Sequence, residues 1–234
     1  MLYLTLPKSA CTTIKNIMYF LDNGEYYSDP ISIHGDGIAL LKWDSPDQDN
    51  YEAAILSRKL AFTFVREPFA RAYSAFNEKF FHDGRHSFPR PRRYLIEHYG
   101  AVFPVDGAEY TPADHGRNFL RFLDFVQDTI DDKVRIKLNG HWAPQKYVVE
   151  SHAAHVNIDV VGKLEHFKQT MKYVLDLANV GVPVDLGVRF NEGPKPPFKL
   201  AEIMTDEIHA KLSRVYGVDV DYFGYGSETD KWAR

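Results

Sequence analysis

Residues 2–21, LYLTLPKSACTTIKNIMYFL, join a strand-like segment to a helix-like one. The apolar run Leu2–Leu6 is typical of a buried β-strand, and Pro7 ends it because proline cannot donate a hydrogen bond to a sheet ladder. Beyond a polar turn, apolar residues recur at the i, i+3, i+4, i+7 spacing of one helix face: Ile14, Ile17, Met18 and Leu21. The segment therefore predicts a strand that passes through a short turn into an amphipathic helix.

The same order of strand, turn and helix recurs downstream. The apolar run Leu60–Val65 precedes Arg66-Glu67-Pro68, where proline suits the first position of a helix. A further strand is expected over Ile158–Val161. Helical spacing predicts helices over residues 69–80, 118–127, 164–177 and 206–216, the last ending at Gly217. Continuous apolar strands alternating with helices indicate an α/β fold with a mainly parallel sheet flanked by helices on both faces.

Composition indicates one globular domain over residues 1–234. The chain is 44% hydrophobic and holds 16 Phe, 14 Tyr and 3 Trp, which is enough material for a core without covalent staples. Its formal net charge of −4 provides no global basic field, so nucleic acid is not an expected partner. Any site for a polyanion must therefore be local.

Cysteine usage and hydropathy bear on the compartment. Cys11 is the single cysteine, which excludes an intrachain disulfide and a Cys-rich zinc site and favours a reducing environment. No apolar run reaches the roughly 18–20 residues of a membrane-spanning helix, and the short apolar start before Pro7 and Lys8 is unlike a signal peptide. We therefore expect a cytoplasmic protein without a membrane span.

Two aperiodic stretches, Arg85–Arg93 and Asn191–Lys199, are expected to be surface loops. The first carries a basic cluster that Pro89 and Pro91 are expected to hold extended. It comprises Arg85, His86, Arg90, Arg92 and Arg93. Two interpretations stay open: a solvated loop, or a binding surface for an anionic glycan or lipid head group.

The turn after Leu2–Leu6 has the ingredients of an anion site. A strand that enters a helix through small and hydroxyl residues presents backbone N–H groups at the positive end of the helix dipole. Lys8 adds a full charge, and Thr12 and Thr13 add hydroxyl donors. The Walker A pattern is absent because the turn contains no glycine. The alternative is that Thr12 or Thr13 merely caps the helix.

The turn after Leu60–Val65 supplies a second candidate. Arg66 stands where a parallel strand ends, the edge at which open α/β sheets bind ligands, and Ser74 follows eight residues later on the next helix. Together they can hold a phosphate by charge-assisted hydrogen bonds. The alternative is an ion pair between Arg66 and Glu67 or another carboxylate.

These segments resemble those of a known family. Residues 6–21, LPKSACTTIKNIMYFL, resemble the 5′-phosphosulfate-binding loop of sulfotransferases, and residues 61–80, AFTFVREPFARAYSAFNEKF, resemble their 3′-phosphate-binding strand and helix. Three later segments are similar to carbohydrate sulfotransferases of the Golgi type, the group with chondroitin, HNK-1 and uronyl 2-O-sulfotransferases: HWAPQ (141–145), VVGKLEHF (160–167) and YGVDVDYFGYG (216–226). The resemblance spans residues 2–226 and implies a P-loop-like three-layer fold.

The resemblance implies 3′-phosphoadenosine 5′-phosphosulfate as sulfate donor, a carbohydrate or glycan-like acceptor, and no metal. Lys8 would contact the 5′-phosphosulfate and act as an electrostatic and acid catalyst on the bridging oxygen. Arg66 and Ser74 would hold the 3′-phosphate. The 5′-phosphate would lie in the turn that follows Lys8, formed by Ser9, Ala10, Cys11, Thr12 and Thr13, with Cys11 lending its backbone N–H.

The acceptor hydroxyl needs a general base, and histidine titrates near neutral pH. His34, in SIHGDG, resembles the first histidine of the HGH stretch of uronyl 2-O-sulfotransferases, with Asp36 in place of the second. His141 is the second candidate, beside Trp142 as a surface for stacking on a sugar. His152 and His155 have an i, i+3 spacing but no visible third metal ligand.

Two other functions stay open: a catalytically inactive homologue that binds nucleotide or glycan, and a P-loop-type small-molecule kinase. Eukaryotic members of the family that this chain resembles have two cysteines after HWxPQ. In this chain Val149 and His152 fall near those two positions, and neither is a cysteine. That difference favours a bacterial-type, soluble, cytoplasmic relative. Neither the acceptor nor the oligomeric state follows from the sequence.

Overall fold

The structure, a computed structural model, describes the whole chain except residues 31, 35–59, 85–86, 105–108, 191–192 and 227–234. Two compact units make up the chain: residues 1–65 with 149–192, and residues 66–148 with 193–234. The first unit carries the sheet, and the second is built from helices. The expectation of one domain over residues 1–234 stays a prediction. None of the helices described is long and apolar enough to cross a membrane.

The sheet of the first unit is parallel, as predicted. Its described strands lie in the order β1 (Leu2–Tyr3), β2 (Ala61–Val65), β3 (Val160–Lys163). β1 is shorter than the predicted strand, although the N–H of Leu4 still donates to the carbonyl of Phe62 at 2.9 Å. β3 starts two residues later than predicted because the carboxylate of Asp159 accepts the N–H of Ala61 at 2.7 Å, where a backbone carbonyl would otherwise do so.

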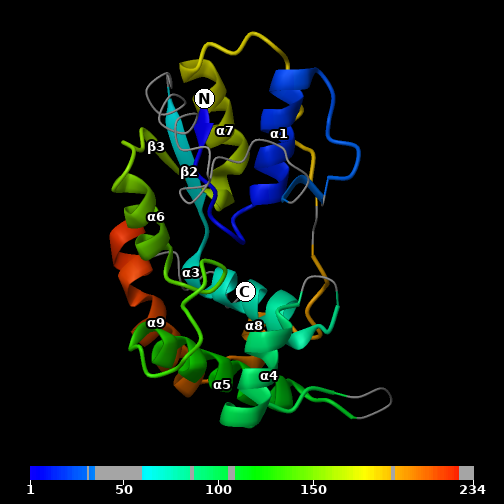
Figure 1. Ribbon diagram of the computed structural model, residues 1–234, viewed down its shortest axis with the longest axis vertical. Coiled ribbons are helices and arrows are strands. Elements are labelled where there is room, and N and C mark those ends of the chain that lie inside the picture. Colours follow the sequence, from blue (N-terminus) through cyan, green and yellow to red (C-terminus); the bar gives the residue numbers. More distant parts are fainter. Residues whose placement is uncertain (31, 35–59, 85–86, 105–108, 191–192, 227–234) are drawn as a thin grey trace. The chain divides into compact units, whose positions relative to one another are not determined.

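Helices cover the sheet, which confirms the predicted α/β architecture. On one face, α1 (Cys11–Asn23) and α7 (Phe167–Leu177) lie beside β2 (Figure 1), and their apolar residues pack on Phe62 and Phe64. The turn η3 (Leu164–His166) connects β3 to α7. Gly162 is required in β3 because a Cβ there would lie 2.7 Å from the ring of Phe64. The opposite face carries a smaller cluster formed by Leu4, Ala61 and Val156.

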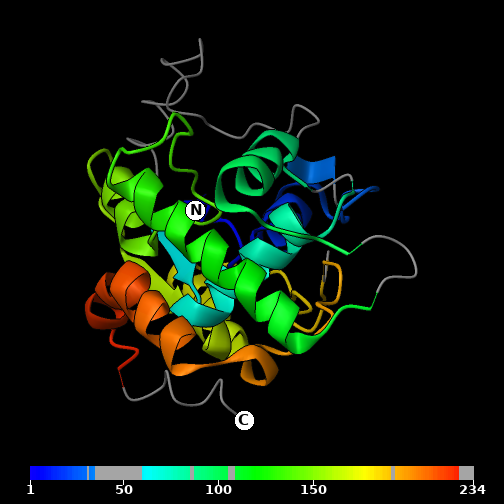
Figure 2. The same ribbon diagram turned by 90° about the horizontal axis from the view of Figure 1, so that it is seen from below.

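The second unit is helical. Figure 2 shows the long green helix α5 beside the orange α9. Apart from α6 (Gln145–Ala153), which starts in this unit and ends in the first, its described helices are α3 (Pro68–Phe76), the π-helix η2 (Asn77–Phe81), α4 (Pro89–Tyr99), α5 (Pro112–Ile130), α8 (Leu200–Ile203) and α9 (Asp206–Phe223).

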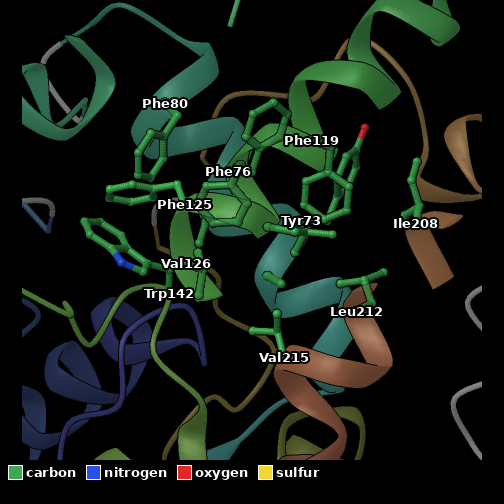
Figure 3. Packing of buried hydrophobic residues seen from close by; sticks show 14 of the residues in the cluster. Tyr73, Phe76, Phe80, Phe119, Phe125, Val126, Trp142, Ile208, Leu212 and Val215 are labelled. Carbon is green, nitrogen blue, oxygen red and sulfur yellow. The ribbon is translucent and has the colours of Figure 1, made fainter. Parts of the chain in front are cut away.

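Aromatic rings fill the core of this unit (Figure 3). Phe76 of α3 lies 5.3 Å from Phe119 of α5, and Phe80 lies 5.1 Å from Trp142, measured between ring centroids. Ile208, Leu212 and Val215 of α9 close the cluster. Rings meeting at tilted or edge-to-face angles add to the stabilisation from burial alone. This core fixes α3, the helix that follows Arg66.

The predicted loop Arg85–Arg93 was wrong in its second half, because α4 begins at Pro89. Proline lacks the N–H that the first helical residue leaves unused, so Pro89 starts a helix instead of holding the chain extended. Arg90 and Arg93 are exposed on it, whereas Arg92 donates from Nε to the carbonyl of Phe80 at 2.9 Å. The other members of the predicted cluster, residues 85 and 86, lie outside the described residues.

The last helix is longer than predicted. Gly217 does not end α9, which continues to Phe223 and terminates at Gly224 with a φ of 64°. A glycine inside a helix costs only about 1 kcal/mol, and the buried side chains of Tyr216 and Asp219 on either side outweigh that cost. α5 also extends beyond the predicted 118–127, because Thr111 and Asp114 form a capping box at its start.

Candidate functional site

The turn between β1 and α1 has an unusual backbone. Lys8 has a φ of 68° and Ala10 a φ of 59°, both in the left-handed region. The other non-glycine residues with positive φ in the described chain are Asp132 and Asn179, types that tolerate this conformation. Lys8 and Ala10 have no such tolerance, and strain of this kind concentrates at ligand-binding turns.

α1 begins without a side-chain cap. Its N-cap residue is Ala10, no acidic residue lies in the first turn, and the first intrahelical bond runs from the N–H of Ile14 to the carbonyl of Ala10 at 3.0 Å. The amides of the three preceding residues stand at the positive end of the helix dipole, and in the described part of the chain no side chain caps them. The alternative that Thr12 or Thr13 caps the helix is therefore wrong.

Both threonines have other partners. The Oγ1 of Thr12 lies 2.9 Å from Nε2 of His34, and the Oγ1 of Thr13 accepts the N–H of Phe190 at 3.2 Å. Ser9 is fully buried, and within the described residues its Oγ has no hydrogen-bond partner. The predicted 5′ turn is thus formed by residues of one segment, and the structure brings His34 to it.

Two neighbours assign the proton on the imidazole of His34. The Nζ of Lys15 lies 3.0 Å from Nδ1, and a lysine ammonium can only donate, so Nδ1 accepts. The neutral ring then carries its proton on Nε2 and donates it to Thr12. His34 itself is exposed. Asp36, expected to orient it, lies outside the described residues.

Asn16 places this histidine and escaped the sequence interpretation. It is fully buried on α1, and its side-chain N–H groups donate to the carbonyl of Thr12 at 2.9 Å and to that of Pro30 at 3.2 Å. Pro30 comes shortly before the 3-10 turn η1 (Ser32–His34). Asn16 therefore ties the segment after α1 to the helix that carries Thr12.

The turn before α3 is built differently. Glu67 caps this helix, and its two carboxylate oxygens accept the N–H groups of Phe69 at 3.1 Å and Ala70 at 2.6 Å. Within α3 only Ala70 and Ser74 are partly exposed. Arg66, four residues before Ala70, is also partly exposed. One side of this segment thus presents a guanidinium, a small residue and a hydroxyl in sequence.

The HWAPQ segment supports Arg66. The side-chain amide of Gln145 accepts the N–H of Arg66 at Oε1 and donates from Nε2 to its carbonyl, both at 2.8 Å. Asp219 of α9 accepts the backbone N–H groups of Gln145 and Lys146, each at 2.8 Å. Burial raises the pKa of Asp219, and these hydrogen bonds oppose that rise. In the sequence, the segments HWAPQ and YGVDVDYFGYG show only a resemblance to the family, and no local pattern in them points to Gln145 or Asp219.

His141 and Trp142 have different environments. Asn139 Oδ1 accepts both the backbone N–H of His141 at 3.0 Å and its ring Nδ1 at 2.7 Å, which places the proton on Nδ1 and the lone pair on Nε2. Trp142 is fully buried. The expectation that Trp142 offers a surface to a sugar is therefore wrong, because its ring belongs to the aromatic core.

Other candidate ligands have structural explanations. Burial lowers the pKa of His152, whose Nε2 lies 3.2 Å from the carbonyl of Thr5. Among the residues that the structure describes, no three His, Cys, Asp or Glu side chains are grouped to hold a metal ion. Cys11 is a free, partly exposed thiol on α1.

Comparisons with known proteins agree with the resemblance. A family model described as "Sulfotransferase family" matches residues 1–226. Carbohydrate sulfotransferase 11 of Mus musculus is 30% identical over 190 residues, which cover 77% of this chain and 51% of the mouse protein. Carbohydrate sulfotransferase 11 of Danio rerio is 30% identical over 251 aligned residues, covering 96% of this chain and 64% of the fish protein.

A more distant relative, carbohydrate sulfotransferase 9 of Homo sapiens, is 27% identical over 225 residues, 94% of this chain and 46% of the human protein. This chain thus spans about half to just under two thirds of the length of these relatives. No solved structure is significantly similar to it. Because the family model covers nearly the whole chain and the relatives agree with it, the chain belongs to the sulfotransferase family, in its carbohydrate sulfotransferase group.

Proposed function

We propose that this protein transfers a sulfuryl group from 3′-phosphoadenosine 5′-phosphosulfate to a hydroxyl of a carbohydrate or glycan-like acceptor. Family membership supports the reaction class, and the relatives' names support a carbohydrate acceptor. The observation that carries the proposal is the strained turn at Lys8 and Ala10, with an uncapped helix after it and His34 bonded to Thr12.

The donor has two anionic ends, and the chain offers two groups of donors. The 5′ end is assigned to Lys8 and to the amides and hydroxyls of residues 9–13, where the helix dipole favours negative charge. The 3′-phosphate is assigned to Arg66 and Ser74, which can supply charge-assisted hydrogen bonds. A nucleotide kinase would have no use for the second group.

The reaction is an in-line displacement at sulfur. The oxygen of the acceptor hydroxyl forms a bond to sulfur while the bond from sulfur to the bridging phosphate oxygen breaks, and that oxygen keeps the electron pair. Lys8 stabilises the charge that grows there, by electrostatics and by proton donation. The sulfuryl group carries less charge than a phosphoryl group, so the proposal includes no metal.

The proton of the acceptor hydroxyl goes to a histidine, and His34 is the first candidate. Thr12 holds its Nε2–H, so the accepting lone pair belongs to Nδ1, beside the ammonium of Lys15. The acceptor hydroxyl would take the place of that ammonium, whose contact with the ring is exposed. His141 is the alternative base, with its lone pair on Nε2.

Two other functions make distinct predictions. An inactive homologue would bind the nucleotide but turn over no acceptor. A P-loop kinase would bind ATP with magnesium, and the absence of glycine from the turn that contains Lys8 weighs against it. The cytoplasmic location expected from the single cysteine stays a prediction.

Thermal unfolding with nucleotides tests the proposal. A ligand that binds the native state raises the melting temperature, by more when it binds more tightly at equal concentration. We expect 3′-phosphoadenosine 5′-phosphate to raise it more than adenosine 5′-phosphate, and more than ATP with magnesium. Equal shifts for the three nucleotides would refute the sulfotransferase proposal. Sulfate transfer from the labelled donor to a panel of glycans then separates an enzyme from an inactive homologue.

A further inference from the structure

Arg66 stands between two regular elements and belongs to neither. β2 ends at Val65, and the first backbone bond of α3 runs from the N–H of Arg71 to the carbonyl of Glu67. The backbone N–H and C=O of Arg66 are both bonded instead by the side-chain amide of Gln145, at 2.8 Å each. Gln145 is fully buried, and its two hydrogen bonds to the partly exposed Arg66 are themselves partly buried.

Gln145 is itself fixed by α9. Its backbone N–H donates to Oδ2 of Asp219, and the next N–H, that of Lys146, donates to Oδ1. Asp219 is fully buried and acts as the cap of α6, although it comes from a distant helix. Burying a carboxylate is costly unless such hydrogen bonds offset the cost. The amide of Gln145 therefore reaches Arg66 from a rigid base.

The segment before Gln145 is held by two further side chains. The guanidinium of Arg71, 1% exposed, donates to the carbonyls of Ala143, at 2.8 Å, and Gly140. The hydroxyl of Tyr216 on α9 donates to the carbonyl of Trp142 at 2.8 Å. The residues from 140 to 145 thus form a brace between α3 and α9, and the brace ends on the backbone of Arg66.

We propose that Gln145, held by Asp219, is a positioning residue that presents the side chain of Arg66 to the 3′-phosphate. The proposal rests on the proposed function, which assigns that phosphate to Arg66 and Ser74. Fixing the backbone of Arg66 sets the direction in which the side chain leaves it, and thus lowers the entropy lost when the guanidinium binds an anion. The brace acts through Arg66 and does not touch the nucleotide.

The chain contains a matched control for the contact with Gln145. The amide of Asn118 on α5 accepts the N–H of Val102 at 3.0 Å and donates to its carbonyl, and Asn118 is 1% exposed. Like Gln145 with Arg66, this amide bonds both backbone groups of one residue of the same unit, and it also donates to the Tyr110 hydroxyl and accepts from Arg121. None of these partners has an assigned role in binding the nucleotide, so removing this amide reports the cost to the fold of losing a buried amide with at least as many hydrogen bonds.

The test compares Gln145→Met with Asn118→Leu, variants that keep side-chain size and remove the amide. For each, the dissociation constants of 3′-phosphoadenosine 5′-phosphate and adenosine 5′-phosphate are measured at one salt concentration, and their ratio gives the preference for the 3′-phosphate. We expect Gln145→Met to lower this preference roughly tenfold, comparable to losing one hydrogen bond to a charged group. Asn118→Leu should keep the wild-type preference even if its melting temperature falls as far.

The outcomes separate the two proposals. A wild-type protein with no preference for the 3′-phosphorylated nucleotide would overturn the proposed function, and with it the role of Arg66. A wild type with the preference, kept in full by Gln145→Met, would overturn only the positioning role. Should Gln145→Met fail to fold, Asp219→Asn carries the test, because it loosens the base of Gln145 and should lower the same ratio.

Discussion

The two strand-to-helix turns of this protein treat the positive end of a helix in opposite ways. At α3, Glu67 places both carboxylate oxygens on the first amides, at 3.1 and 2.6 Å. At α1, Ala10 has no side-chain cap to offer and holds a left-handed backbone, and no acidic residue follows in the first turn. A carboxylate of the preceding residue thus opposes the helix dipole at the second turn, whereas at the first turn the described residues provide no such cap.

This difference assigns two modes of anion recognition. We propose that at the first turn an anion is bound by backbone amides together with Lys8, because the first turn of α1 holds no acidic residue and, among the residues described, no side chain caps the helix. At the second turn Glu67 accepts the first amides, so the 3′-phosphate that we assign to this turn would be held by the side chains of Arg66 and Ser74. This contrast supports our proposal that the first turn binds the reacting end of the donor and the second turn binds the end that does not react.

The largest expected effect comes from removing the general base. It shows whether the base belongs to the first turn or to the second unit. His34 is bonded to Thr12 of the first turn, whereas His141 belongs to the brace of the second unit. We expect His34→Gln to lower kcat by about 10²–10⁴, the range for loss of a general base. His141→Gln is the matched control and should lower kcat far less. Steady-state sulfate transfer checks both, and the reverse ranking would make His141 the base.

Lys8 tests whether the first turn acts in catalysis or only in binding. Lys8→Ala keeps the backbone and removes the ammonium. We expect kcat to fall about 10²–10³-fold, the usual loss for one group that stabilises transition-state charge. Affinity for 3′-phosphoadenosine 5′-phosphate should change less than tenfold, because the amides of the turn stay in place. Equal losses in both quantities would show that Lys8 is only a ligand.

Acid should lower the stability of the helical unit, whose helix α3 follows the second turn. His115 is fully buried and packs on α3, with its ring 5.7 Å from that of Tyr73 and 5.2 Å from that of Phe76. Burial, with a contribution from nearby His82, lowers its pKa from 6.5 to about 4. The unfolded chain therefore binds the proton first as pH falls. Stability is intact above about pH 6.5 and is lost progressively toward pH 4, by up to roughly 3 kcal/mol.

Urea unfolding between pH 7 and pH 4 measures this loss, and His115→Phe serves as the comparison because the surrounding side chains are aromatic. We expect the variant to lose less stability than the wild type over this range. The free energy of unfolding of the variant should still depend on pH to some extent, because the pKa of His152 in the first unit is also lowered by burial. If His115→Phe and the wild type lost equal stability between pH 7 and pH 4, a neutral, buried His115 would be contradicted.

Substitution of Arg66 tests whether side chains bind the 3′-phosphate at the second turn. We expect Arg66→Gln to weaken binding of 3′-phosphoadenosine 5′-phosphate about 10–100-fold and to leave adenosine 5′-phosphate unaffected, since a charge-assisted contact to the 3′-phosphate is lost. Ser74→Ala should follow the same pattern with a smaller loss. Titration calorimetry at fixed ionic strength measures both. Equal weakening of the two nucleotides would place Arg66 outside the 3′ site.

Local patterns in the sequence were enough to predict the sheet and both turns. Apolar runs identified the parallel strands, and Lys8 and Arg66 drew notice as charges placed where strands end. The partners of these residues depend on contacts between distant segments, which no local pattern reports. Gln145 reaches Arg66 across 79 positions and Asp219 reaches Gln145 across 74. The prediction for Trp142 was wrong for the same reason, because its burial depends on the rings of Phe88, of Phe80 in η2 and of Phe125 in α5.

The smallest expected effect concerns the backbone, and the two turns should respond with opposite signs. Ala10→Gly relieves a left-handed alanine and should stabilise the protein by up to about 1 kcal/mol. Glu67→Ala removes a cap that accepts two amides and should destabilise it by about 1 kcal/mol. Urea unfolding at pH 7 measures both variants. If Ala10→Gly destabilised the protein instead, the first turn would carry no backbone strain to relieve, and only its missing carboxylate would distinguish it from the second.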